Sequence, residues 1–171
     1  AASYFAYWGK ARPLQAASDA GAENDQAPRC HLLAFHSLDV AACGTALIRL
    51  PQFSLASLGD ALGWPLDTVE RLFVYFLALH DLGKFARAFQ GLARDLSEAL
   101  VPVDGAPPYA TRHDTLGWFL WQSIQDEISE TGLPCPSDRF WACWVRAVVG
   151  HHGLPPVEAS NTIMDGGDPA H

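Results

Sequence analysis

The stretch Leu77-Ala78-Leu79-His80-Asp81-Leu82-Gly83-Lys84-Phe85 places an imidazole and a carboxylate side by side in an otherwise apolar run. An isolated carboxylate is costly to bury unless an opposite charge lies beside it. A metal ion supplies that charge, and a carboxylate can bridge two ions where an imidazole cannot. Asp81 therefore predicts a metal site inside a helical core.

Apolar residues recur at helical spacing in the blocks on either side of this stretch. We expect helices over His31–Leu50, Thr68–Leu92 with Asp67 as its N-cap, and Thr115–Ile128, and one that begins at Ser137 or Asp138 and is ended by Gly153. Turn-forming sequence predicts a mobile loop over residues 14–29, a second loop over 101–111 and an irregular tail over 153–171. Strand patterns are nearly absent, so the predicted fold is all-α, one helical domain over residues 1–171.

The composition excludes a disordered chain, because 49% of the residues are hydrophobic and only 18% are charged. The net charge of −8 argues against a protein that grips a phosphate backbone through basic patches. Two divalent ions would reduce that charge to about −4 and make the centre of the site locally positive.

The cysteines follow no pattern of a disulfide framework or a zinc ribbon, because the chain has four of them and no CxxC pair. We expect buried, reduced thiols in a cytoplasmic protein. No signal peptide and no long apolar run is present, so we expect no membrane partner.

Five of the seven histidines form a set whose members lie in or at the ends of the predicted helices. His36 and His80 fall within the first two, His113 opens the third, and His151-His152 close the last. Helices that bring such residues to one centre make a metal site in a bundle core. This ligand set suits Zn, Fe, Ni, Co or Mn rather than Ca.

Two ions about 3.5–4 Å apart could clamp a phosphate and turn a bound water into a nucleophile. Lys84 stands four residues after His80, on the same face of the predicted helix, where it could hold a phosphate oxygen or protonate a leaving group. Each feature alone has an ordinary explanation: a core histidine, a solvated lysine, or histidines that stabilise a helix C-terminus.

Four sequence motifs between Tyr4 and about Pro155 resemble those of a known family. They are Tyr7-Trp8-Gly9-Lys10, the segment His31–Ala42, Ala78–Phe85 with Phe89-Gln90, and Val149-Gly150-His151-His152-Gly153. Through His80-Asp81 the chain resembles the HD superfamily of metal-dependent phosphohydrolases. The four motifs together are most similar to those of the HD nuclease domain of the CRISPR-associated helicase-nuclease of type I systems, in the subtype E branch recruited by Cascade.

The resemblance implies an HD-domain helical bundle with a central metal site and two divalent transition-metal ions (Mn, Ni, Co, Fe or Zn, with Mg also allowed). The first ion would be held by His36, His80, Asp81 and a later aspartate, and the second by Asp81, His113, His151 and His152. Asp81 and Lys84 would be catalytic, with Lys84 beside the scissile phosphate. The implied activity is cutting of single-stranded DNA, namely the strand displaced by Cascade and fed in by the helicase.

The sequence departs from the family pattern at two points. No Ala-Asp-Trp phrase follows the double histidine, and Asp165 and Asp168 lie in a glycine-rich tail, which we expect to be truncated. No nucleotide-binding Gly-x-x-x-x-Gly-Lys-Thr loop is present, so the helicase is expected as a separate domain or subunit.

Two other functions stay open from sequence. One is an HD phosphohydrolase of small nucleotides. The other is a catalytically idle module that docks onto Cascade or a helicase through surface tryptophans such as Trp8, Trp118 and Trp121, although these residues also suit plain core packing.

Overall fold

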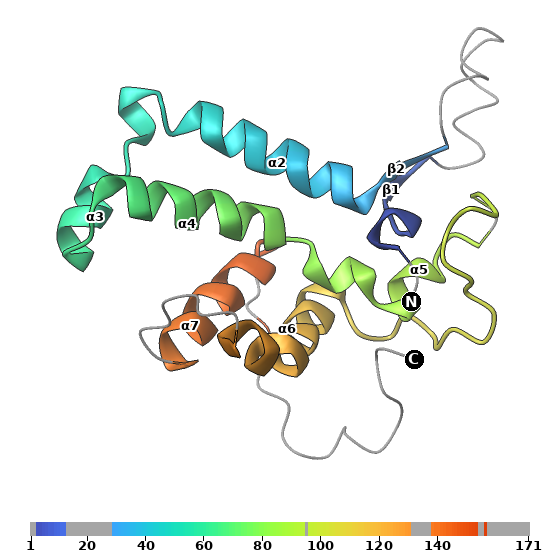
Figure 1. Cartoon of the computed structure of the whole chain (residues 1–171). Coiled ribbons are helices and arrows are strands. Elements are labelled where there is room, and N and C mark those ends of the chain that lie inside the picture. Colours follow the sequence, from blue (N-terminus) through green and yellow to red (C-terminus); the bar gives the residue numbers. More distant parts are fainter. Residues whose placement is uncertain (1–2, 13–28, 95, 131–137, 154–155, 157–171) are drawn as a thin grey trace, which may run out of the picture.

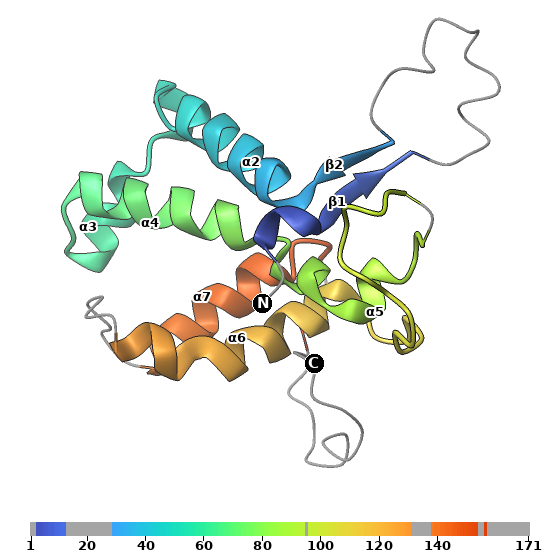
Figure 2. The same ribbon diagram turned by 45° about the vertical axis from the view of Figure 1, so that its right-hand side comes forward.

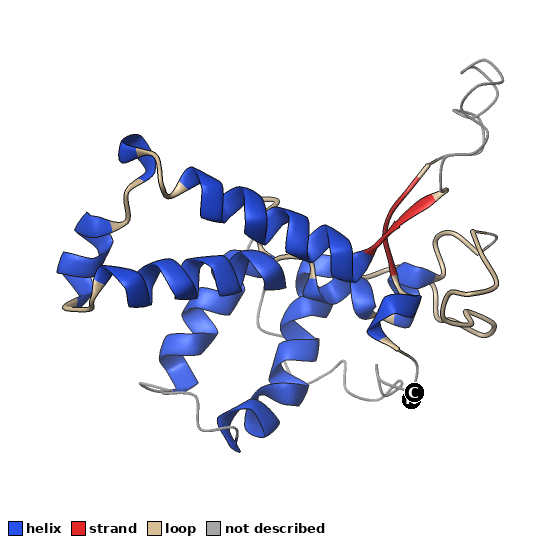
Figure 3. Ribbon diagram, turned by 45° about the horizontal axis from the view of Figure 1, so that its top comes forward, coloured by secondary structure: helices blue, strands red, loops and turns tan. Residues whose placement is uncertain are grey.

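The computed structural model describes residues 3–12, 29–94, 96–130, 138–153 and 156. Helices make up most of these residues and strands form one small ribbon, which confirms the predicted all-α class (Figures 1 and 3). The elements are η1 (Tyr4–Ala6), β1 (Trp8–Ala11), β2 (Cys30–Leu32), α2 (Leu33–Leu47), η3 (Pro51–Phe53), α3 (Ala56–Leu62), α4 (Leu66–Leu79), η4 (Leu82–Phe85), α5 (Arg87–Gln90), α6 (His113–Glu130) and α7 (Asp138–Val149).

Helices α2 and α4 lie side by side, and α6 and α7 pack together on the other side of α4 (Figure 1). The buried core joins α4, η4, α6 and α7 through Phe76, Leu82, Trp118, Trp121, Val145 and Val149. Trp8, Trp118 and Trp121 are all buried, which confirms plain core packing and excludes the alternative that they are surface anchors. Large aromatic surfaces gain more from burial in a core than from exposure to water.

The predicted helix over Thr68–Leu92 is wrong, because it is broken at His80-Asp81 into α4, the 3₁₀-helix η4 and the short α5. Just after the break, η4 packs so closely on α6 that a methyl group on Gly83 would overlap the carbonyl oxygen of His113. Asp67 does not cap α4, whose N-cap is Pro65, but lies in its first turn and pairs with Arg71 at 2.9 Å.

A two-stranded antiparallel ribbon was not predicted. Strand β1 pairs with β2 through Lys10↔His31 and Ala11↔Cys30, so the helix expected from His31 begins only at Leu33 and ends at Leu47. The strands are three and four residues long and are separated by residues 12–29, and such short segments carry no readable alternation.

Buried Gln90 anchors β1. Its side chain accepts a hydrogen bond from Trp8 N at 3.1 Å and donates to Trp8 O at 3.0 Å, while the Trp8 indole donates to Gln90 O at 3.2 Å. These contacts tie the N-terminal segment to α5, more than 80 residues away in sequence.

Other expectations differ in detail. Helix α6 begins at His113 and reaches Glu130, beyond the expected Thr115–Ile128. Cys43 and Cys143 are exposed and Cys30 is half-buried, so the expectation of buried thiols is wrong for them, and Cys135 lies outside the described residues. Residues 101–112 contain no helix or strand. Of the expected loop over 14–29, residues 14–28 lie outside the described residues, as does most of the expected tail.

Within the described ranges no single helix is long and apolar enough to span a membrane; the sharply bent pair Leu33–Leu47 and Pro51–Leu62 meets the criterion by length and composition only.

Candidate metal centre

Asp81 lies at the break between α4 and η4 and is 3% exposed. Its Oδ2 atom lies 3.0 Å from His36 Nε2 and 3.1 Å from His80 Nε2, and it forms an ion pair with Lys84 Nζ at 2.8 Å. Had the helix continued through residue 84 as predicted, the carboxylate would have faced a different set of neighbours. The break is therefore what aims it at α2.

The second oxygen of Asp81 faces the opposite way. Oδ1 lies 3.5 Å from His113 Nε2 on α6 and 3.7 Å from His151 Nε2, just beyond the end of α7. It is buried and accepts no hydrogen bond from the described residues. A buried carboxylate oxygen without a partner is destabilising, because it has lost water and gained nothing.

The predicted ligands gather into two clusters around this carboxylate. His36, His80 and Asp81 form one, and His113, His151 and His152 form the other; within each, one ligand atom from every residue lies within 4.8 Å of the others. The first cluster is mostly buried, whereas His151 and His152 of the second are exposed. Asp81 links them, with one oxygen toward each.

The rings are oriented by contacts on their far side. His80 Nδ1 lies 2.7 Å from Leu77 O, and His151 Nδ1 lies 3.2 Å from Val148 O. A carbonyl oxygen can only accept, so each Nδ1 carries a proton, and Nε2 is the atom left to bind a metal ion once it is unprotonated. Backbone carbonyls at helix ends thus set the tautomer that a metal ligand needs.

The charge balance of the centre favours an ionised Asp81 and neutral His36, His113 and His151. Burial raises the pKa of Asp81, but hydrogen bonds from His80 and Lys84, with their charges, outweigh it and hold the pKa well below its usual range. Burial lowers the pKa of His36, His113 and His151, against the opposing pull of Asp81. Neutral imidazole and ionised carboxylate are the forms that bind metal.

Lys84 reaches the centre by a different route from the one predicted. It does not share a helical face with His80, because residues 82–85 form a 3₁₀-helix. Its Nζ instead bonds Asp81, three residues earlier, and donates to Gly9 O at 3.2 Å. The ammonium group is therefore held between the bridging carboxylate and β1.

Three supporting residues were not predicted. Buried Gln90 donates to Lys84 O at 2.7 Å and so links β1 to η4. Tyr109 Oη lies 3.1 Å from His113 Nδ1 and accepts the His113 backbone N–H at 2.8 Å. Asp114, 3% exposed, pairs with Arg112 at 3.2 Å. Gln90 falls in a phrase of the resemblance, but no local pattern marks Tyr109 or Asp114.

The residues present fit a divalent transition metal. The orphaned Asp81 Oδ1 needs a positive partner, and His113 Nε2 and His152 Nε2 face each other at 3.1 Å, where a cation would satisfy both lone pairs. Imidazole and carboxylate are the donors that such ions select. Asp165 and Asp168, the remaining candidates for a later carboxylate, lie outside the described residues.

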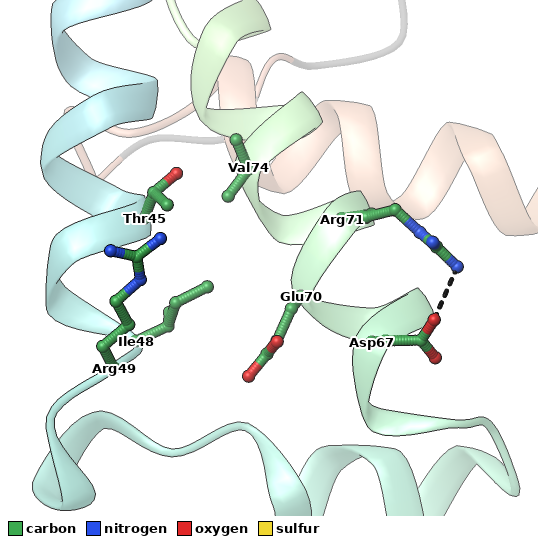
Figure 4. Close-up of a pocket in the computed structure, with 7 residues that line it drawn as sticks. All are labelled: Thr45, Ile48, Arg49, Asp67, Glu70, Arg71 and Val74. Carbon is green, nitrogen blue, oxygen red and sulfur yellow. Dashed lines mark ion pairs between the residues drawn. The ribbon is translucent and has the colours of Figure 1, made fainter.

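A pocket of about 400 Å³ lies elsewhere, between the far ends of α2 and α4 (Figure 4). It is lined by Thr45, Ile48, Arg49, Asp67, Glu70, Arg71 and Val74. None of these residues belongs to the two clusters, so the pocket takes no part in the centre.

Comparison with known proteins agrees with the geometry. The family model described as "Cas3, HD domain" matches residues 8–169. CRISPR-associated endonuclease/helicase Cas3 of Escherichia coli (strain K12) is 29% identical over an alignment that covers 86% of this chain and 17% of that protein. No solved structure matches the chain significantly. With nearly the whole chain matched and the paired His-Asp clusters in place, the protein belongs to the Cas3 HD domain family, a CRISPR-associated family of the nuclease and phosphohydrolase class.

Proposed function

We propose that this domain is a metal-dependent nuclease that hydrolyses phosphodiester bonds of single-stranded DNA at a two-metal centre. The observation that carries the proposal is the division of the Asp81 carboxylate, with Oδ2 toward one imidazole cluster and Oδ1, without a hydrogen bond, toward the other. A bridging carboxylate of this kind suits two ions that act on one phosphate.

Each residue has a distinct role in this proposal. His36 and His80 would hold the first ion and His113, His151 and His152 the second, with Asp81 shared between the two groups. When bound, such ions would supply positive charge to the phosphate and lower the pKa of a water molecule. Lys84, beside Asp81 Oδ2, is placed to hold a phosphate oxygen or to give a proton to the leaving oxygen.

The open side of the centre favours a long substrate over a small nucleotide. His151 and His152 are exposed, so the second cluster faces solvent, whereas His36 and Asp81 on the other side are buried. A strand can lie across such a rim, whereas a small nucleotide needs an enclosing pocket to bury most of its surface.

The partners follow from the relative. That protein is described as an endonuclease/helicase, and this chain spans 17% of its length. We infer that a helicase domain or subunit feeds the strand and that Cascade supplies it by displacing one strand of the target. Burial of Trp8, Trp118 and Trp121 removes the feature on which an idle docking module was argued.

The test is cleavage of labelled single-stranded DNA in buffers with Mn²⁺ or Ni²⁺, comparing the unmodified protein with Asp81→Ala. The variant should retain its fold by circular dichroism and lose cutting. Asp67→Asn is the matched control: it removes an exposed carboxylate on α4 that pairs only with Arg71 among the described residues, and it should cut normally. Persistent cutting by Asp81→Ala refutes the proposed centre.

A further inference from the structure

One face of the β1–β2 ribbon carries a cluster of basic side chains. Lys10 pairs with His31 across the ribbon, and the Arg12 backbone N–H donates to Arg29 O at 2.9 Å, which extends the ladder by one step. Side chains two residues apart on a strand, and those directly opposite, point to the same face. Lys10, Arg12, Arg29 and His31 therefore share one face, and all are exposed.

This clustering runs against the composition of the chain. The ribbon holds three of the chain's 11 lysine and arginine residues, in a protein of net charge −8. Asp39 of α2 pairs with His31 at 2.9 Å, so we define the cationic face by its lysine and arginines, Lys10, Arg12 and Arg29. Phosphate groups of a nucleic-acid strand are the anions that such side chains contact.

The ribbon begins at the metal centre. The Gly9 carbonyl oxygen accepts a hydrogen bond from Lys84 Nζ at 3.2 Å, and a methyl group on Gly9 would lie 3.2 Å from His36 Cβ. Lys10 is the next residue, and from there the ribbon runs outward, away from the helices (Figure 2). A strand whose phosphates lie along this face would therefore reach the Asp81 carboxylate.

We propose that the cationic face of the β1–β2 ribbon, formed by Lys10, Arg12 and Arg29, binds phosphates of the substrate strand and guides it into the metal centre. This inference rests on the proposed function, because it assumes that the substrate is a nucleic-acid strand. The net charge of −8 argued against contacts to a phosphate backbone, and the ribbon would provide such contacts locally. Phosphate contacts of this kind hold the strand without reading its sequence.

The experiment measures fluorescence anisotropy of a labelled oligothymidylate of about 20 nucleotides in EDTA, so that binding is seen without cutting. The double variant Lys10→Gln/Arg12→Gln should bind several-fold more weakly. The slope of log Kd against log salt should also fall by about 1.4, because each lost contact to single-stranded DNA accounts for about 0.7. Melting temperatures show that each variant is folded.

Two controls separate charge from side-chain shape and from position. Lys10→Arg/Arg12→Lys keeps both charges and should keep the affinity and the salt slope. Arg71→Gln removes a cation from the pocket between α2 and α4, at the other end of the 15-residue α2 and about 22 Å away, and should also bind normally (Figure 4).

The outcomes distinguish this proposal from the proposed function. If the unmodified protein binds and cuts DNA but the double variant binds it equally well, the ribbon proposal is overturned and the nuclease stands; the ribbon would then suit an acidic protein surface. If the unmodified protein turns over a small phosphodiester such as bis(4-nitrophenyl) phosphate but neither binds nor cuts DNA, the proposed function fails and the ribbon proposal fails with it.

Discussion

Replacing Gly83 with alanine should damage the metal centre from outside its ligand set. Gly83 lies in η4, two residues after Asp81, at the point where η4 meets the backbone of α6. A methyl group there would overlap the carbonyl oxygen of His113 and the backbone nitrogen of Gly117, and would lie 2.7 Å from the carbonyl carbon of His113. Backbone atoms cannot rotate away as the end of a side chain can.

The size of the effect follows from these contacts. Ordinary contacts between carbon atoms lie near 3.5–4.0 Å, so η4 and α6 must separate by about 1 Å or more. Overpacking of a core costs about 3 kcal/mol at the upper end of its usual range, which lowers the melting temperature by about 6–12 °C in a domain of this size. The same shift moves Asp81 away from His113, and a misplacement of about 1 Å costs about a hundredfold in rate.

The assay combines thermal melts, with and without Mn²⁺, and cleavage of single-stranded DNA. Gly83→Ala should melt lower, gain less from the metal and cut about a hundredfold more slowly. Gly44→Ala is the matched control, because the atoms nearest to a methyl group there belong to the side chains of Leu77 and Phe73, which can rotate away, so the response to metal should be normal. A Gly83→Ala protein with unchanged melting and metal response would refute the argument that this close approach positions the centre.

Three further outcomes are expected. Gln90→Ala should lower stability by about 3 kcal/mol in a denaturant titration, because Trp8 loses buried hydrogen-bond partners on its backbone; a loss below about 1 kcal/mol would contradict this. Tyr109→Phe should weaken metal binding about tenfold by calorimetry while the fold persists, because His113 Nδ1 loses the hydroxyl that orients it; unchanged affinity would speak against that role. The metal-free protein should lose stability as the pH falls below about 6.5, because burial holds the pKa of His36, His113 and His151 below that ordinary value, so the unfolded chain binds more protons there. The stability that the ionised Asp81 contributes is lost only when the pH falls below the ordinary pKa of an aspartate, 3.8. Stability that is flat or rises from pH 7 to pH 5 would contradict the assignment.

The identity of the candidate ligands could be predicted from the sequence because it depends on local features. Asp81 is conspicuous as a carboxylate among leucines, and the periodicity of apolar residues places histidines on helices. The same periodicity was misleading at residues 80–92, where apolar residues continue in helical register although the chain leaves the helix. Contact between η4 and α6 outweighs helix propensity there, and propensity carries no information about a neighbour some 30 residues away.

By itself, then, the sequence determined the helical class, the family and the residue types able to hold metal at the centre. Only the tertiary structure decided how Asp81 divides its oxygens between two clusters, that Lys84 pairs with Asp81 rather than sharing a face with His80, and that basic residues on either side of residues 13–28 meet on one ribbon. The physical reason is that composition and periodicity report which side chains gain from burial. The direction in which a buried group points is set by long-range packing, such as the approach of Gly83 to α6 and the anchoring of Trp8 by Gln90.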